Sequence, residues 1–146
     1  GYGADANFVC VDVKDKNNIN PVALGLMSTP TMLFWELYGM NLGGGGGPIK
    51  LNPAYTKNTL ILLPRYFGKN KIGIFERESK SIFEECGIDT ESDLPIEKQD
   101  PKPLPDRKEL DDIVFDALGL FEDERKDMYR AVCRLVWNRI SKAKNI

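Results

Sequence analysis

The chain has 146 residues, of which 42% are hydrophobic and 29% charged, with a formal net charge of −2 and no histidine. This length and apolar content predict one soluble domain with a single core. The missing histidine removes the usual general base near neutral pH and the commonest metal ligand, so triad hydrolases and most zinc or iron sites are excluded.

The first predicted elements are a strand and a long kinked helix. Residues 8–13 are rich in branched and aromatic side chains and end in a polar loop, which is typical of a strand. Asn20 and Pro21 predict a helix start, because asparagine caps free amides and proline at the first helical position loses no hydrogen bond. Pro30 interrupts this helix, which we expect to continue to about Tyr38.

Five consecutive glycines, Gly43, Gly44, Gly45, Gly46 and Gly47, follow the kinked helix. Ordering such a run is costly in backbone entropy, so it indicates either a close approach to another molecule or a hinge. Neither the dinucleotide-binding spacing nor a Gly-Lys-Ser/Thr ending accompanies it, which argues against a nucleotide loop.

The segments after the glycines predict the rest of a small sheet. Residues 59–63 form a short apolar run that ends at a proline, and residues 71–75 are a second strand candidate. Residues 76–86 predict a short helix. We therefore expect an α+β fold in which residues 1–87 form one subdomain, with a small β-sheet and the long kinked helix.

The remainder predicts a connector and a helical hairpin. Residues 88–105 contain four prolines and many acids, as expected of an exposed connector. Asp106 and Glu109 have the spacing of a capping box, and Gly119 ends the helix that they begin. A second helix is predicted from about Glu122 to Lys142, so residues 106–146 should form an antiparallel helical hairpin.

Charge divides the chain unequally at Phe75. The first part carries seven basic and four acidic residues, 7 − 4 = +3, and the rest carries 13 basic and 18 acidic residues, 13 − 18 = −5. This separation favours a polyanion partner for the first part, although exposed lysines also serve solubility alone.

The cysteines and the apolar runs indicate the compartment. Cys10, Cys86 and Cys133 are widely spaced and never form C-x-x-C, which predicts core thiols in a reducing cytoplasm. No secretory leader or membrane-spanning run is recognisable, so we expect a cytoplasmic protein with no membrane partner. The chain begins without methionine, and we interpret it as a piece of something longer.

One motif near the glycines has the residue types of a catalytic signature. Asn52-Pro53-Ala54-Tyr55 is similar to the Asn-Pro-Pro-Tyr motif of amino-group methyltransferases. It lacks the second proline and a preceding buried strand, so a turn is the preferred interpretation.

A basic cluster with interleaved aromatics follows, and we predict that its members bind DNA. Cations can neutralise phosphates, and glycines let backbone amides approach a groove. The alternative is a solvated sheet edge. A stripe at Lys126, Arg130 and Arg134 is typical of the wet face of an amphipathic helix. The predicted DNA-binding residues are Lys50, Lys57, Arg65, Tyr66, Lys69 and Lys71 with Gly43, Gly44, Gly45, Gly46 and Gly47.

The order of these segments resembles one known family. The block from Asn20 to Lys50, with Gly-Leu-Met-Ser-Thr-Pro-Thr, Trp-Glu-Leu-Tyr-Gly and Asn-Leu-Gly-Gly, is similar to the end of the target-recognition domain of restriction-modification adenine-N6 DNA methyltransferases. The closing segments, residues 110–120 and 129–139, resemble the carboxy-terminal tail of many of these proteins. The chain departs from the pattern at Phe121, where serine or threonine commonly caps the last helix, and in its longer glycine run.

The resemblance implies a specificity fragment that grips duplex DNA beside its own N-terminal catalytic domain. That missing domain would bind S-adenosylmethionine and methylate adenine, and some relatives also cleave DNA, whereas this fragment would hold no cofactor, metal or catalytic residue. A docking module that uses the hairpin without touching DNA is the main rival. A free-standing methyltransferase is a third hypothesis, and it requires binding of S-adenosylmethionine by the chain itself.

Overall fold

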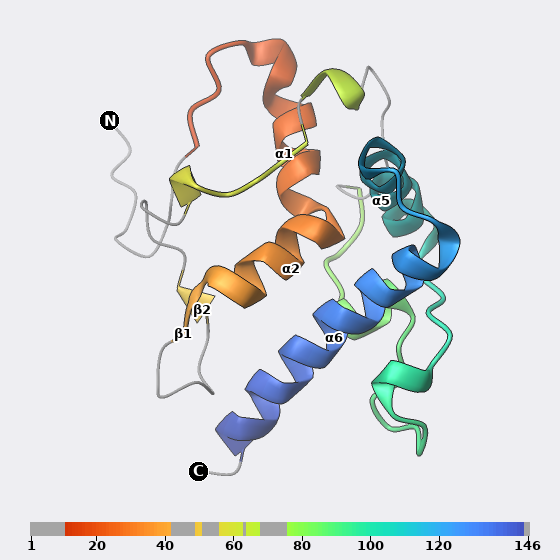
Figure 1. Cartoon of the computed structure of the whole chain (residues 1–146). Coiled ribbons are helices and arrows are strands. Elements are labelled where there is room, and N and C mark those ends of the chain that lie inside the picture. The colour runs from red at the N-terminus through yellow and green to blue at the C-terminus, as the bar shows by residue number, and fades with distance from the viewer. Residues whose placement is uncertain (1–10, 42–48, 51–55, 63, 68–75, 145–146) are drawn as a thin grey trace.

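The computed structural model of the protein describes residues 11–41, 49–50, 56–62, 64–67 and 76–144, and this part is mostly helical (Figure 1). Two short strands, β1 (Met40–Asn41) and β2 (Ile49–Lys50), pair antiparallel with Met40 opposite Lys50. The longer helices are α1 (Ile19–Met27), α2 (Thr29–Tyr38), α4 (Ile82–Cys86), α5 (Pro105–Leu118) and α6 (Glu122–Lys144), and the 3-10 helices include η1 (Lys16–Asn18), η2 (Pro64–Tyr66) and η4 (Ile96–Lys98).

The predicted α+β class is wrong, because the expected sheet strands do not form in the described residues. Residues 11–13 and 59–62 are not strands, and the rest of the predicted strands, including 71–75, lies outside the described residues. Residues 59–62 instead run along the helices. Trp35 Nε1 donates to Thr59 Oγ1 at 2.9 Å, and Ile61 and Leu62 lie against α1 at Gly25. Leu60 is 73% exposed, so the run is only partly covered by the helices.

The kink in the first helix is confirmed as a break between α1 and α2 at Ser28. Ser28 has an extended backbone, with φ −65° and ψ 148°, and its hydroxyl donates to the Gly25 carbonyl at 2.9 Å. Pro30 lies in the first turn of α2, where its missing N–H costs nothing. The break therefore turns the chain without leaving the Ser28 hydroxyl unpaired.

Both closing helices form, but the predicted antiparallel hairpin is wrong. Gly119 ends α5 with φ 71°, a left-handed conformation that favours glycine. In Figure 1, α6 lies alongside α2 while α5 points in a different direction, and α6 packs mainly on α2, η4 and α4. The two helices meet near their connecting turn, where the Phe115 and Tyr129 rings lie 5.6 Å apart in an edge-on arrangement.

The predicted capping box at the start of α5 is also wrong. Pro105 begins the helix, and Leu104 precedes it without a side-chain cap. The Asp106 carboxylate is turned to Arg77 instead. A capping box does occur at α4, where Ser81 and Glu84 bond each other's backbone N–H groups.

The core has two clusters on either side of α5. Segment 88–105 contributes Ile88 and Ile96 to the first cluster, so it is not wholly exposed. Cys86 and Cys133 are buried free thiols, as predicted, while Cys10 lies outside the described residues. None of the described helices is long and apolar enough to cross a bilayer. The first cluster is Cys86, Ile88, Ile96, Phe115, Tyr129, Val132 and Cys133, and the second is Leu24, Phe67, Leu110 and Val114.

Candidate nucleic-acid interface

The predicted DNA-binding residues that the structure describes lie in three separate segments. Lys50 is on β2, Lys57 is in the turn at residues 56–58, and Arg65 and Tyr66 are in η2. All four are exposed. Figure 1 shows these segments spaced along the N-terminal part of the molecule, from the end of α2 to the far end of α1. Lys69, Lys71 and the glycines Gly43 to Gly47 lie outside the described residues.

Arg65 and Tyr66 form one unit. The Arg65 guanidinium lies over the Tyr66 ring at 5.3 Å from its centroid, which is within the range of a cation–π contact. The next residue, Phe67, is fully buried in the second core cluster and anchors η2 between α1 and α5. A rigid cation with an adjoining aromatic face is thereby presented to solvent.

Lys57 is held near the end of α2 by its neighbours. Thr59 accepts the Trp35 indole N–H at 2.9 Å, so the chain just after Lys57 is bonded to α2. Lys57 precedes this stretch and is exposed. Its position is therefore set by the helix, although the Lys57 side chain has no described ion pair.

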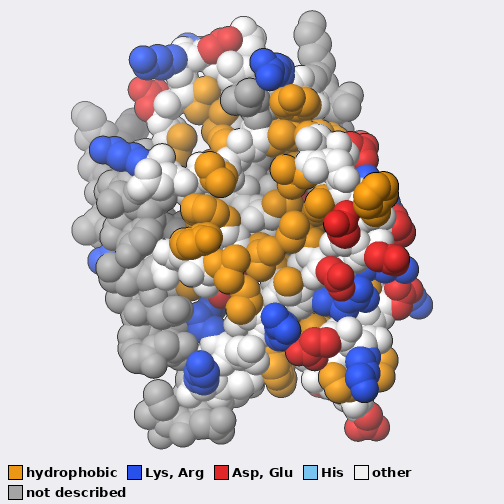
Figure 2. Space-filling model, viewed as in Figure 1, with side chains coloured by type: hydrophobic (Ala, Val, Ile, Leu, Met, Phe, Trp, Pro, Cys, Tyr) orange, Lys and Arg blue, Asp and Glu red, His pale blue; other side chains and the backbone are white. Residues whose placement is uncertain are grey.

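The described ion pairs lie in the second part of the chain or join it to Glu36, and this leaves several cations of the first part without a described carboxylate. Each ion pair among the described residues takes its cation from Arg77 or a later residue. Figure 2 shows acidic and basic side chains interleaved along the right-hand side of the molecule. Lys50, Lys57 and Arg65 have no carboxylate partner within the described part. Within that part, no neighbouring carboxylate neutralises their charge.

The one acid of the first part after Asp15 is neutralised internally. Glu36 on α2 accepts two hydrogen bonds from Arg139 on α6. Arg139 Nε donates to Glu36 Oε2 at 3.0 Å, and Arg139 Nη2 donates to Glu36 Oε1 at 2.8 Å. This bond raises the pKa of Arg139 above its usual range. The pair also ties α6 to α2, and it leaves the first part of the chain more positive than its formal charge.

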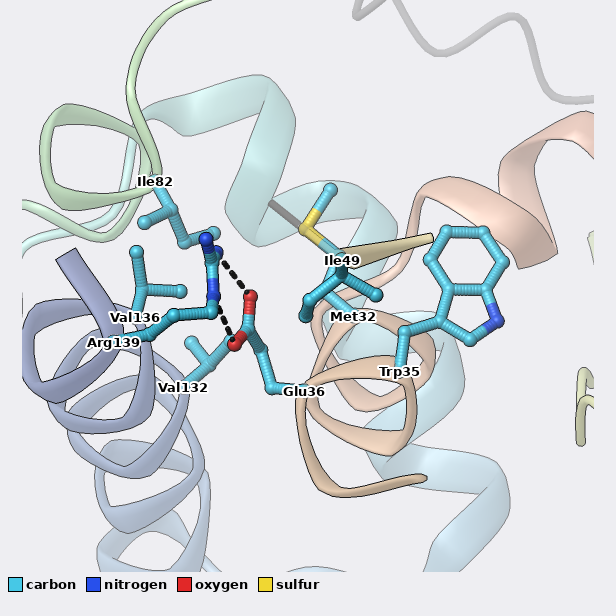
Figure 3. A pocket seen from close by; sticks show the side chains of 8 residues that line it. All are labelled: Met32, Trp35, Glu36, Ile49, Ile82, Val132, Val136 and Arg139. Atoms are coloured by element: carbon cyan, nitrogen blue, oxygen red, sulfur yellow. Dashed lines mark hydrogen bonds and ion pairs between the residues drawn. The ribbon is translucent and has the colours of Figure 1, made fainter. Parts of the chain in front are cut away.

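This ion pair forms part of the wall of a mostly apolar cavity of about 410 Å³ (Figure 3). Figure 3 shows Glu36 and Arg139 facing each other between α2 and α6, with hydrophobic side chains around them. Figure 2 shows hydrophobic side chains gathered in the middle of the same face. The pair therefore lies in a setting of low polarity, where breaking it would be costly. The cavity is lined by Met32, Trp35, Glu36, Ile49, Ile82, Val132, Val136 and Arg139.

A second charged cluster lies beneath the start of α5. Arg107 is 2% exposed, and its Nε donates to Glu85 Oε2 at 3.1 Å. Arg77 donates to both Glu85 oxygens, at 2.7 and 2.9 Å, and also bonds Asp106. Burial acts to raise the pKa of Glu85, but the bonds from Arg77 and Arg107 outweigh it and lower the pKa below its usual value. This cluster is structural, because its charges are satisfied within the fold.

Asp111 joins α5 to the start of α2. Its carboxylate accepts the Thr29 backbone N–H at 2.7 Å and the Thr29 hydroxyl at 2.6 Å, so it caps α2 from a distant part of the chain. Burial raises the pKa of Asp111 to about 6, although Arg107 and Thr29 act in the opposite direction. Sequence reasoning missed Asp111, because nothing local distinguishes it from an exposed helical aspartate.

The Lys126, Arg130 and Arg134 stripe divides between two roles. Lys126 pairs with Asp100 at 2.7 Å, and Arg130 donates to the Gln99 carbonyl at 3.1 Å, so both hold the segment before α5. Arg134 is exposed. The described residues hold no cluster of side chains able to ligate a metal ion.

Comparison with known proteins identifies no relative. No family model, curated protein or solved structure matches the chain.

Proposed function

We propose that the chain is the DNA sequence-recognition fragment of an adenine-specific DNA methyltransferase of a restriction-modification system. It grips duplex DNA for its own N-terminal catalytic domain, which binds S-adenosylmethionine and lies outside this chain. The fragment works in the cytoplasm and performs no catalysis alone. Whether the parent protein also cleaves DNA depends on that missing part.

The observation that carries this proposal is the set of cations without internal partners. Lys50, Lys57 and Arg65 are exposed and lack a carboxylate partner among the described residues, while Glu36 is occupied by Arg139. Phosphates are the polyanion that such cations commonly neutralise in duplex DNA. The Arg65–Tyr66 unit adds an aromatic face next to a cation, a combination that also suits nucleic acid.

The resemblance in the sequence gives the proposal its specific form. The Asn20 to Lys50 block covers α1, α2 and the β1–β2 pair, which lie directly beside the candidate cations. The proposal thus places recognition on the part of the chain that is similar to a target-recognition domain.

The test is binding of a fluorescent duplex to the chain at low salt. The double variant Lys57→Glu with Arg65→Glu should weaken binding at least tenfold, because two phosphate contacts become repulsive. Arg134→Glu is the matched control, since it reverses an exposed arginine on α6, and it should bind within about twofold of the native chain. Absence of duplex binding by the native chain, or equal losses in both variants, would overturn the proposal.

A docking module is the second candidate, and one observation favours it. Leu118 and Phe121, at the turn between α5 and α6, are 54% and 79% exposed. Large hydrophobic side chains exposed together suit a protein contact. If this candidate is right, Phe121→Ser separates the chain from its catalytic domain in a co-purification assay and leaves any duplex binding by the isolated chain unchanged.

A further inference from the structure

A small aromatic pocket lies at the end of α2, beside the β1–β2 pair. Its volume is about 280 Å³, and Phe34, Trp35, Tyr38, Gly39 and Asn58 line it. The Phe34 and Tyr38 rings are one helical turn apart, with centroids at 4.8 Å and planes at 40°. Among the described residues that line the pocket, three are therefore aromatic.

The pocket is held open by contacts outside it. The Trp35 indole is fixed by its hydrogen bond to Thr59. At Gly39 a Cβ would lie 2.5 Å from the Trp35 carbonyl oxygen and 2.5 Å from Ile49 Cγ2, so no side chain can stand there. Tyr38 is 62% exposed, so it is not part of the hydrophobic core.

The size and aromatic lining of this pocket favour a planar ligand. Its volume is just below the usual range for ligand sites, about 300 to 1,000 Å³, and so suits one flat ring system. Aromatic side chains stack on nucleobases with little regard to sequence. Lys57 directly precedes the lining residue Asn58 in the sequence, is exposed, and has no ion pair in the described part, so a cation lies next to this stretch of the chain.

We propose that this pocket holds one unpaired nucleobase of the bound DNA. The proposal rests on the proposed function and adds the form of DNA that the chain prefers. In a continuous duplex each base is covered on both faces by its neighbours, so aromatic side chains can stack only on a base that has left the stack. The pocket therefore selects duplexes that contain an extrahelical base.

The chain offers its own reporter for this site. It contains two tryptophans, and only Trp35 lines the pocket, while Trp137 lies on α6. Trp137→Phe leaves Trp35 as the single tryptophan, and Trp35→Phe leaves Trp137 as the matched control. The probes are three short duplexes of one sequence: fully paired, with one unpaired adenine, and with an abasic site in place of that adenine.

Each duplex is titrated into the single-tryptophan variants, and the tryptophan emission and the affinity are measured. The duplex with the unpaired adenine should quench Trp35 and bind about tenfold more tightly than the other two, whereas Trp137 emission should not change. Tyr38→Leu should abolish this preference. Tyr66→Leu, which alters an exposed aromatic elsewhere, should weaken all three duplexes alike and keep the preference.

Failure of this inference is distinguishable from failure of the proposed function. If all three duplexes bind equally and Trp35 emission is unchanged, the pocket does not take a base, but DNA binding stands. If no duplex binds at low salt, both proposals are wrong. If an aromatic peptide quenches Trp35 and the unpaired adenine does not, the pocket belongs to a protein partner and the inference is overturned.

Discussion

Replacing Asp111 with asparagine should change how the stability of the protein depends on pH. The Asp111 carboxylate is fully buried and caps α2 through Thr29. Burial raises its pKa from 3.8 to about 6 in the folded protein. The folded state therefore binds a proton in a pH range where the unfolded chain has released it.

The sign and size of the effect follow from proton linkage. Because the folded-state pKa is raised, the contribution of Asp111 to stability is greatest below pH 3.8 and is lost as the pH rises to about 6. The whole window corresponds to about 3 kcal/mol, and about 2 kcal/mol of it falls between pH 7 and pH 4.5. The native chain should gain this amount relative to Asp111→Asn on acidification.

Urea denaturation of both proteins at several pH values measures this difference. The paired carboxylates Glu85 and Asp106 have lowered pKa values and lose their contributions in acid, but they do so in both proteins and cancel in the comparison. Thr29→Val removes a hydrogen bond that stabilises the charged carboxylate, so it should move the window to higher pH. A stability gap that stays constant from pH 7 to pH 4.5 would refute the reasoning.

Two further predictions each compare a substitution with the same substitution at a second position of the chain. Glu85→Gln should lower the free energy of unfolding by about 3 kcal/mol or more, because it leaves the buried Arg107 without its carboxylate, while Glu84→Gln on the exposed side of α4 should cost much less in the same urea titration. Gly119→Ala should cost about 1 kcal/mol for its positive φ alone, since no atom lies near the added Cβ. Gly87→Ala should lower the melting temperature further, because the added Cβ would also meet the Lys102 backbone; equal losses for the two alanines would contradict this.

The parts of the fold that could be predicted are those decided by local chemistry. Pro30 marked the break between α1 and α2, and Gly119 marked the end of α5. Each acts through its own backbone geometry, so no distant contact can reverse it. Where a predicted cap competed with a distant partner, the prediction was wrong: Asp106 bonds Arg77 from inside the first turn of α5, and Leu104 is the N-cap residue.

The sheet could not be predicted because a short apolar run has no fixed partner. Residues 59–62 carry the composition of a buried strand, but Thr59 is bonded to Trp35 of α2, Ile61 and Leu62 lie against α1, and Leu60 is exposed. The same limit applies to the site. Arg65 and Tyr66 were found from their residue types, whereas the aromatic pocket required the placement of Asn58 against α2, which only the fold determines.

The salt dependence of duplex binding tests the central claim most directly. For the native chain the logarithm of the association constant should fall steeply and linearly with the logarithm of the salt concentration. Arg65→Ala should reduce that slope by about one, because one phosphate contact is lost, and Arg134→Ala should leave it unchanged. A native slope near zero, or a slope that Arg65→Ala does not alter, would contradict DNA recognition by this surface.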